Sequence, residues 1–308
     1  EWEFAEPEER VTSSPVVVDG TVYVGDWNGT VYAVDAETGV REWRFVEAES
    51  DVFSSVTVVN GTAYFGSQEG FDGAVYAVDA ETGETEWEFA EPEAQVPSAP
   101  TVVDGTVFAG STDGKLYAVE ADTGETVWSF DMNDSVVSSP TVAGGKVFFG
   151  TVNETFYAVD AETGAREWSL ETDGAVISSA TAVDGTVYVG SSEVQNEELG
   201  GTVYAVDAET GEVTWRFTNP RAWIRSSPTV VDGRVYVGSI DTNLYAVEAA
   251  TGRGVWEFET DGEVFSSPTV ANSTAYFGSH DSSLYAVDTE TGEEMWRFTE
   301  ASGEVFSS

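Results

Sequence analysis

The feature that most constrains this chain is a repeat of about 40 residues. The string YAVDAETG occurs four times unchanged, at residues 32–39, 76–83, 157–164 and 204–211, with close variants at 117–124, 245–252 and 285–292. A tryptophan follows every copy at a fixed short distance. A period of this length is typical of solenoids, propellers and other repeat arrays.

The residue types within one repeat distinguish between these architectures. Residues 226–258, SSPTVVDGRVYVGSIDTNLYAVEAATGRGVWEF, divide into four short segments rich in Val, Tyr, Thr, Phe and Trp, with Gly or Asp at each break. Their alternating pattern favours four antiparallel strands, and no repeat contains an amphipathic stretch of helical length. The sequence therefore predicts an all-β chain, a β-propeller with four-stranded blades, forming a single domain over residues 1–308.

Seven complete modules of four strands are expected. They start near Ser13, Ser54, Ser98, Ser138, Ser178, Ser226 and Ser266. Residues 1–12 and 305–308 are partial repeats, with EWEF (1–4) predicted as an extra fourth strand and VFSS (305–308) as the start of an extra first strand. Two arrangements stay open: a seven-bladed ring with overhanging ends, or most of an eight-bladed ring, which the preserved repeat register favours. Because the chain lacks an initiator Met, we expect a processed chain or a segment of a longer protein.

A motif of eleven residues identifies the kind of repeat. Residues 33–43, AVDAETGVREW, follow the pattern A-x-D-x-x-T-G-x-x-x-W, which recurs in every module, with Glu120 and Glu248 in place of the Asp. The pattern resembles the tryptophan-docking motif of the quinoprotein-type (PQQ-like) β-propeller repeat, shared by BamB-like propellers. The resemblance implies that each motif tryptophan slots between neighbouring blades near the motif glycine: Trp43, Trp87, Trp128, Trp168, Trp215, Trp256 and Trp296.

The same resemblance implies that Asp35 and Thr38 brace the turn. The residue types agree, because Asp and Thr side chains bond local backbone in turns and Gly39 permits a left-handed conformation. A catalytic site does not need seven copies of itself. The motif is therefore interpreted as structural.

The charge of the chain excludes several classes of partner. Twelve Lys and Arg residues stand against 56 Asp and Glu residues, a net charge of −44. Such a field repels nucleic acid and anionic lipid. No apolar run approaches the roughly 18 residues of a membrane helix, so no direct membrane insertion is predicted. Acid spread along the whole chain favours a protein of a high-salt environment, a halophile, with cations bound loosely to its surface.

No cofactor is expected. The resemblance also extends to dehydrogenases that bind pyrroloquinoline quinone (PQQ) with Ca²⁺, but this chain has no Cys, little room for insertions and no distinct Glu/Asn/Asp set. Asp26-Trp27-Asn28-Gly29 and Asp241-Thr242-Asn243 open like calcium loops yet lack the later ligands, so Asx turns are predicted instead. PQQ with Ca²⁺ is kept as the alternative.

Departures from the repeat gather in two kinds of connection: between the second and third strands of a module, and between modules. These connections are expected to share one face. The candidate binding residues on it are Asp26, Trp27, Phe71, Arg221, Trp223, Arg225 and His280. Exposed Trp and Arg commonly anchor interfaces. The alternative is that repeat loops simply drift and that Trp223 covers a blade edge.

No catalytic residue is predicted. His280-Asp281 suggests acid–base chemistry, but no nucleophile stands out beside it. We expect a non-enzymatic scaffold that presents its variable loop face to a protein or another extended partner. The alternatives are a PQQ- and Ca²⁺-dependent dehydrogenase and a structural spacer domain in a larger surface or sensor protein. The sequence does not indicate a compartment, and the family resemblance alone favours an extracytoplasmic or cell-surface location.

Overall fold

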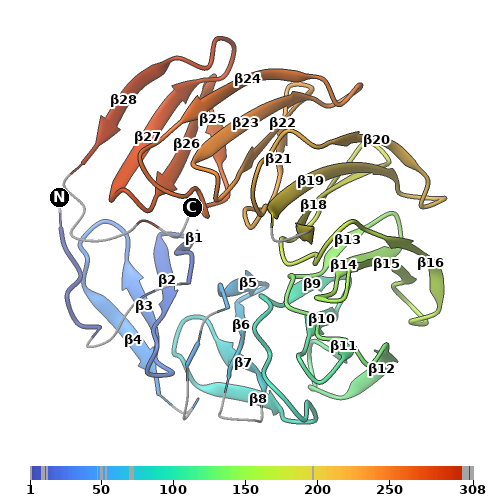
Figure 1. Ribbon diagram of the computed structural model, residues 1–308. Coiled ribbons are helices and arrows are strands. Elements are labelled where there is room, and N and C mark those ends of the chain that lie inside the picture. The colour runs from blue at the N-terminus through green and yellow to red at the C-terminus, as the bar shows by residue number, and fades with distance from the viewer. Residues whose placement is uncertain are drawn as a thin grey trace. The chain divides into compact units, whose positions relative to one another are not determined.

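The computed structural model (Figure 1) describes residues 2–7, 11, 13–46, 48, 51–52, 54–68, 73–195, 198–299 and 305. Within these residues every regular secondary-structure element is a β-strand, and the strands form seven four-stranded antiparallel sheets. This confirms the predicted β-propeller with four-stranded blades. By contacts the chain divides into two compact units, Glu1–Pro140 with Glu162–Ala165, and Thr141–Ala161 with Arg166–Ser308. Each unit is described by itself.

The first unit contains three blades, and in each the strands pair in chain order. Blade 1 consists of β1 (Val16–Val18), β2 (Thr21–Gly25), β3 (Val31–Asp35) and β4 (Arg41–Phe45). Blade 2 consists of β5 (Thr57–Val59), β6 (Thr62–Gly66), β7 (Val75–Asp79) and β8 (Thr85–Phe89). Blade 3 consists of β9 (Thr101–Val103), β10 (Thr106–Gly110), β11 (Lys115–Glu120) and β12 (Thr126–Asp131).

The second unit contains four blades with the same strand order. Blade 4 consists of β13 (Thr141–Ala143), β14 (Lys146–Gly150), β15 (Thr155–Asp160) and β16 (Arg166–Glu171). Blade 5 consists of β17 (Thr181–Val183), β18 (Thr186–Gln195), β19 (Glu198–Asp207) and β20 (Val213–Phe217). Blade 6 consists of β21 (Thr229–Val231), β22 (Arg234–Gly238), β23 (Asn243–Glu248) and β24 (Gly254–Glu259). Blade 7 consists of β25 (Thr269–Ala271), β26 (Thr274–Ser279), β27 (Ser283–Asp288) and β28 (Glu294–Phe298).

The predicted extra strand at residues 1–4 is wrong for the part described, because residues 2–4 belong to no strand. Trp2 nevertheless contacts Gly39 of blade 1, and its indole Nε1 donates to the carbonyl of Ala36 at 3.0 Å. Of the predicted strand start at 305–308 the structure describes Val305, which packs against Gly278. Both terminal contacts repeat those made between successive modules, although neither segment forms a described strand.

On one face of each blade, the turns form at residues that tolerate a left-handed backbone conformation. In the turn between β1 and β2, Asp19 and Gly20 have φ of 49° and 88°, as a two-residue type I′ hairpin requires. In the turn between β3 and β4, Asp35 Oδ1 accepts from the Thr38 backbone N at 2.7 Å and from the Thr38 hydroxyl. The two turns meet through the Ala36 amide, which donates to the Gly20 carbonyl at 2.8 Å.

The other face carries the connections in which the sequence varies. The amide of Val52, which precedes blade 2, donates to the carbonyl of Asp26 in the β2–β3 connection of blade 1 at 3.1 Å. In the second unit, the Val264 amide donates in the same way to the Ser239 carbonyl at 3.1 Å. Each inter-module loop is therefore fixed to the second connection of the blade before it.

The core lies between successive blades, where the motif tryptophans dock. Trp43 donates from Nε1 to the Ala80 carbonyl at 2.9 Å, and a Cβ at Gly83 would come within 2.7 Å of its ring. Only glycine permits this approach. The same ring-to-glycine contact is made by the five motif tryptophans that follow: Trp87 on Gly124, Trp128 on Gly164, Trp168 on Gly211, Trp215 on Gly252 and Trp256 on Gly292. Trp296 departs from the expectation, since it is 45% exposed and contacts none of the glycines of the described chain.

Candidate functional site

Asp26 belongs to the architecture of its turn. It is 1% exposed, and its Oδ1 accepts from the backbone N of Asn28 and of Thr30, both at 2.9 Å. Its Oδ2 accepts from the Tyr32 hydroxyl at 3.2 Å. These contacts form the predicted Asx turn and leave the carboxylate no open side for a partner.

An aspartate–tyrosine brace of this kind recurs in other blades. The hydroxyls of Tyr117, Tyr245 and Tyr285 donate to Asp113, Asp241 and Asp281 at 2.6, 2.8 and 2.6 Å. Asp281 therefore points into its own turn. Trp27, next to Asp26, is half-buried in the first unit. Phe71 lies outside the described residues.

The inter-module loop at residues 218–225, in the second unit, is fixed on two sides. On one side, Trp223 Nε1 donates a hydrogen bond of 3.0 Å to the carbonyl of Glu193, which belongs to the extended β18–β19 hairpin of blade 5. On the other side the Ile240 amide of blade 6 donates to the Trp223 carbonyl at 3.0 Å. Ile224 is fully buried against Gly190 and Gly201. The β18–β19 hairpin thus holds the Trp223 side chain in place through the Glu193 carbonyl.

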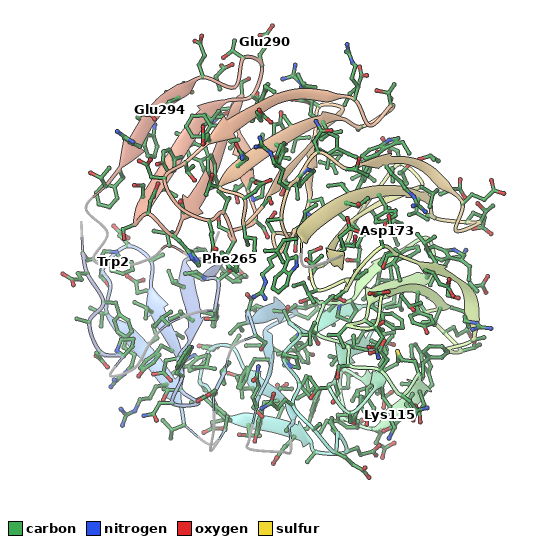
Figure 2. The ribbon with its side chains drawn as sticks, in the orientation of Figure 1. Trp2, Lys115, Asp173, Phe265, Glu290 and Glu294 are labelled. Carbon is green, nitrogen blue, oxygen red and sulfur yellow. The ribbon has the colours of Figure 1, made fainter. Side chains whose placement is uncertain are left out.

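Four side chains from connections next to blades 6 and 7 contact one another in sequence. We call this group the aromatic–arginine stack, and it consists of Trp223, Arg225, Phe265 and His280. The Arg225 guanidinium carbon lies 5.1 Å from the Trp223 ring centroid and 5.4 Å from that of Phe265. Phe265 (Figure 2) in turn stacks on the His280 ring at 4.2 Å and 8°. Cation–π attraction therefore links the guanidinium to two aromatic rings, and the second of these rings is stacked on His280.

His280 is placed by residues of the preceding loop. Its backbone N donates to the Glu263 carbonyl at 2.9 Å, and its Nδ1 lies 3.5 Å from Glu263 Oε2. The imidazole thus closes one end of the stack. Within the second unit, the structure brings together three residues singled out from sequence, Trp223, Arg225 and His280.

Phe265 and Glu263 were missed by the sequence reasoning, although a signal for Phe265 existed. Arg225 and Phe265 occupy the same position of successive modules, directly after the apolar residue that packs on a glycine in the second strand of the preceding blade. The first strands of these blades, β21 and β25, contact each other. At this position the eight copies are Thr12, Phe53, Pro97, Val137, Ile177, Arg225, Phe265 and Phe306, so only Arg225 is charged.

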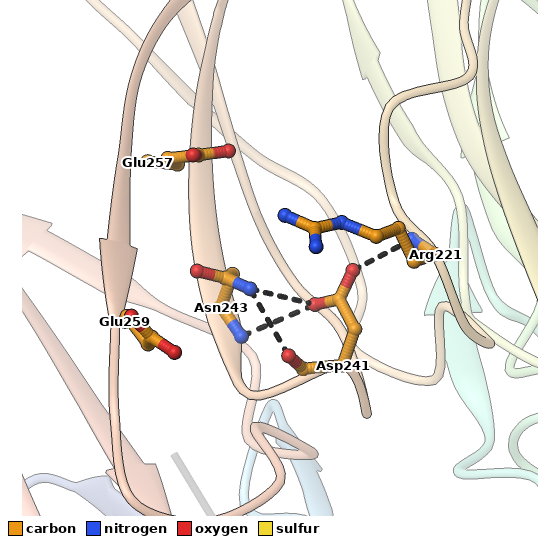
Figure 3. Close-up of a pocket in the computed structure, with 5 residues that line it drawn as sticks. All are labelled: Arg221, Asp241, Asn243, Glu257 and Glu259. Carbon is orange, nitrogen blue, oxygen red and sulfur yellow. Dashed lines mark hydrogen bonds between the residues drawn. The ribbon is translucent and has the colours of Figure 1, made fainter.

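Arg221 lies beside a polar pocket of about 270 Å³ lined by Arg221, Asp241, Asn243, Glu257 and Glu259. Its backbone N donates to Asp241 Oδ2 at 2.7 Å. Figure 3 shows its guanidinium extended toward β24, which carries both glutamates. The lining has three carboxylates and one guanidinium, so its charge favours a basic occupant.

The calcium-like sequence Asp241-Thr242-Asn243 forms hydrogen bonds within its own turn. Over the described ranges, no group of three or more His, Cys, Asp and Glu residues is arranged to hold a metal ion. The Asp241 carboxylate is already engaged by Tyr245, the Arg221 amide and Asn243. In the same described ranges, no helix is long and apolar enough to span a membrane.

Three solved structures show the same fold. A computationally designed protein, Ika8, has a TM-score of 0.84 and 17% identity, with 98% of this chain and 90% of that chain covered. BamB from Moraxella catarrhalis has a TM-score of 0.71 and 22% identity, with coverages of 92% and 84%. A europium-containing methanol dehydrogenase has a TM-score of 0.75 and 15% identity, with coverages of 97% and 80%. At these identities the likeness concerns the fold alone.

The comparison of sequences is more specific. No curated protein matches the chain. The family model described as outer membrane protein assembly factor BamB matches residues 1–88, 71–198 and 199–307, nearly the whole length. On this match, and on the docking motif that recurs in every blade, the chain belongs to the family of the outer membrane protein assembly factor BamB.

Proposed function

We propose that this chain is a non-catalytic scaffold that binds a protein partner through its variable loop face. The observation that carries the proposal is the aromatic–arginine stack, where departures from the repeat in successive blades converge. Membership of the BamB family supports a role in protein assembly. It also supports an extracytoplasmic or cell-surface location.

The physical character of the stack suits an interface. Trp and Arg are the residues most often found to carry binding energy. The loop is fixed by backbone hydrogen bonds on both sides, so a partner would order few groups on binding. Covering the hairpin explains the Trp223 hydrogen bond, but it does not explain why Arg225 is exposed at a position that is otherwise uncharged.

A site-specific photocrosslinker tests this proposal. It is introduced at exposed Asn219, in the stack's own loop, and separately at exposed Ala250, in a turn on the opposite face of blade 6. We expect one discrete protein adduct from position 219, lost when Arg225→Ala and Phe265→Ala are combined, and none from position 250. Thermal melting of each variant serves as the folding control. Equal adducts from both positions would contradict the proposal, and no adduct from either would favour a spacer.

Trp27 is proposed as a further contact on the loop connections of the first unit. Trp27→Ala should leave the melting temperature unchanged and weaken capture of the partner identified by crosslinking. A loss of stability with full capture would instead assign Trp27 to packing. The net charge of −44 supports a partner that is not a nucleic acid. It also supports cations that bind only loosely to the acidic surface.

A quinoprotein dehydrogenase is the alternative that the fold permits, since a methanol dehydrogenase shares it. Adding PQQ and Ca²⁺ to the purified chain separates the two functions. We expect no cofactor absorbance band and no dye-linked oxidation of alcohols or sugars. A band together with turnover would support the enzyme.

A further inference from the structure

We propose that Arg225 is a carboxylate-binding anchor, which receives an acidic side chain or a C-terminal carboxylate of the protein partner. The inference rests on the proposed function and adds the chemistry of the group that is recognised. It depends on the surroundings of one guanidinium in the second unit.

Two aromatic rings lie close to that guanidinium. Trp223 and Phe265 lie 5.1 and 5.4 Å away as ring centroids. Trp223 is itself held by its hydrogen bond to Glu193, and Phe265 by its stacking on His280. Both rings that contact the guanidinium are thus held in place by neighbours of their own.

The edge of the guanidinium remains available. Across the described chain, neither the ion pairs nor the side-chain hydrogen bonds engage the Arg225 guanidinium, even though the chain has 56 acidic residues. A cation–π contact does not use the N–H donors of a guanidinium, and Arg225 is exposed, so these donors remain available to a partner. Those donors match a carboxylate with two parallel hydrogen bonds.

The surroundings favour such a contact in two ways. The two nearby aromatic rings reduce the contact of the guanidinium with water, which strengthens a charge pair formed beside them. Because the side chain is already immobilised, little rotamer entropy remains to be lost on binding. Trp223 and Phe265 offer apolar surface on either side, so we expect the partner's carboxylate to be flanked by an apolar or aromatic group.

The net charge of the chain sets the conditions. A net charge of −44 repels an acidic segment at a distance, whereas salt near 1 M reduces the screening length to about 3 Å. A contact pair between stacked groups is screened much less than that field. Recognition of a carboxylate is therefore expected to be measurable in concentrated salt.

Heteronuclear NMR of the full chain in about 1 M KCl tests the anchor. The probes are benzoate, its neutral isostere benzamide, and N-ethylguanidinium. We expect benzoate to shift the Arg225 Nε–H and Trp223 indole N–H resonances saturably, with little response to benzamide. Arg225→Gln should raise the apparent Kd for benzoate by about tenfold or more, and Arg225→Lys should give an intermediate loss, because lysine lacks the planar fork.

Arg253→Gln is the matched control, because Arg253 lies on the opposite face and faces Glu248 at 3.6 Å. It should leave the benzoate response intact. Equal responses to benzoate and benzamide, or to benzoate in the wild type and Arg225→Gln, would overturn the anchor. So would shifts caused by N-ethylguanidinium alone, which would assign recognition to the acidic pocket beside Arg221. Crosslinking from position 219 that persists in any of these cases would leave the scaffold proposal standing.

Discussion

At the scale of single residues, the repeated turn between the third and fourth strands stabilises the ionised form of its aspartate through hydrogen bonds. Asp79 Oδ1 accepts from the Thr82 backbone N and from the Thr82 hydroxyl, both at 2.8 Å. The Thr82 hydroxyl bond, followed by the Thr82 backbone bond, lowers the pKa of Asp79 below its ordinary value of 3.8. Asp35, Asp207 and Asp288 have lowered pKa values for the same kind of reason.

Removing the hydroxyl should therefore change the acid titration of this turn. A depressed folded-state pKa means that the stabilisation is present above the unfolded value and is lost as pH falls through the folded value. In Thr82→Ala the Asp79 pKa should rise toward 3.8, while Thr82→Ser should keep it low. Titration of the Asp79 carboxyl carbon by NMR measures both. An unchanged Asp79 pKa in the alanine variant would refute the role of the hydroxyl.

At the scale of elements, the fourth strand of each blade carries the motif tryptophan, and six of these seven tryptophans dock on a motif glycine in the described chain. Trp87 of β8 is 8% exposed and donates to the Ala121 carbonyl at 2.8 Å. Trp296 of β28 has the same motif and is 45% exposed. Its ring meets Tyr276 at 5.9 Å within its own blade.

Trp87 and Trp296 should therefore differ in how much stability is lost when each is replaced by alanine. Trp87→Ala should cost about 3–5 kcal/mol, because it empties a buried site. Trp296→Ala should cost about 1 kcal/mol, the magnitude of one aromatic pair. Urea unfolding at fixed salt measures both, and equal losses would show that docking on glycine is not what makes the motif tryptophan stabilising.

At the scale of the whole molecule, the dominant quantity is the net charge of −44. Like charges spread over the chain repel one another in the folded state, and salt screens this repulsion. The high-salt hypothesis from sequence depends on this balance.

Melting temperature should therefore rise between low salt and about 1 M KCl. A variant with Glu37, Glu81, Glu162 and Glu290 changed to Gln, all exposed in the repeated turns, should show a smaller rise. Calorimetry of both chains measures the difference. A melting temperature that is flat with KCl in the native sequence would refute the hypothesis.

The repeat made most of the architecture predictable, because its signals are local. Asp-Gly pairs specify the first turn of a blade, and the Asp, Thr and Gly of the motif specify the third. The exceptions are also physical. Residues 2–4 keep the docking tryptophan without forming a strand. Trp296 keeps the motif, but its ring does not lie against any glycine that the structure describes.

The candidate site was predictable only in part. Arg225, Trp223 and His280 stood out because they depart from the register, whereas Phe265 obeys it and was overlooked. Asp26 also departs from the register, yet its carboxylate accepts hydrogen bonds from two backbone amides and a tyrosine hydroxyl of its own blade. Sequence alone does not distinguish an aspartate that faces its own turn from one that faces a partner.

The sequence by itself determined the four-stranded blade and its turns, because these depend on residues within one period of about 40. Only the tertiary structure decided that Arg225 lies between Trp223 and Phe265 and that Phe265 rests on His280. Those contacts join residues of different modules, and they exist because the first strands of successive blades pack together. Packing between modules is not encoded in any one copy of the repeat.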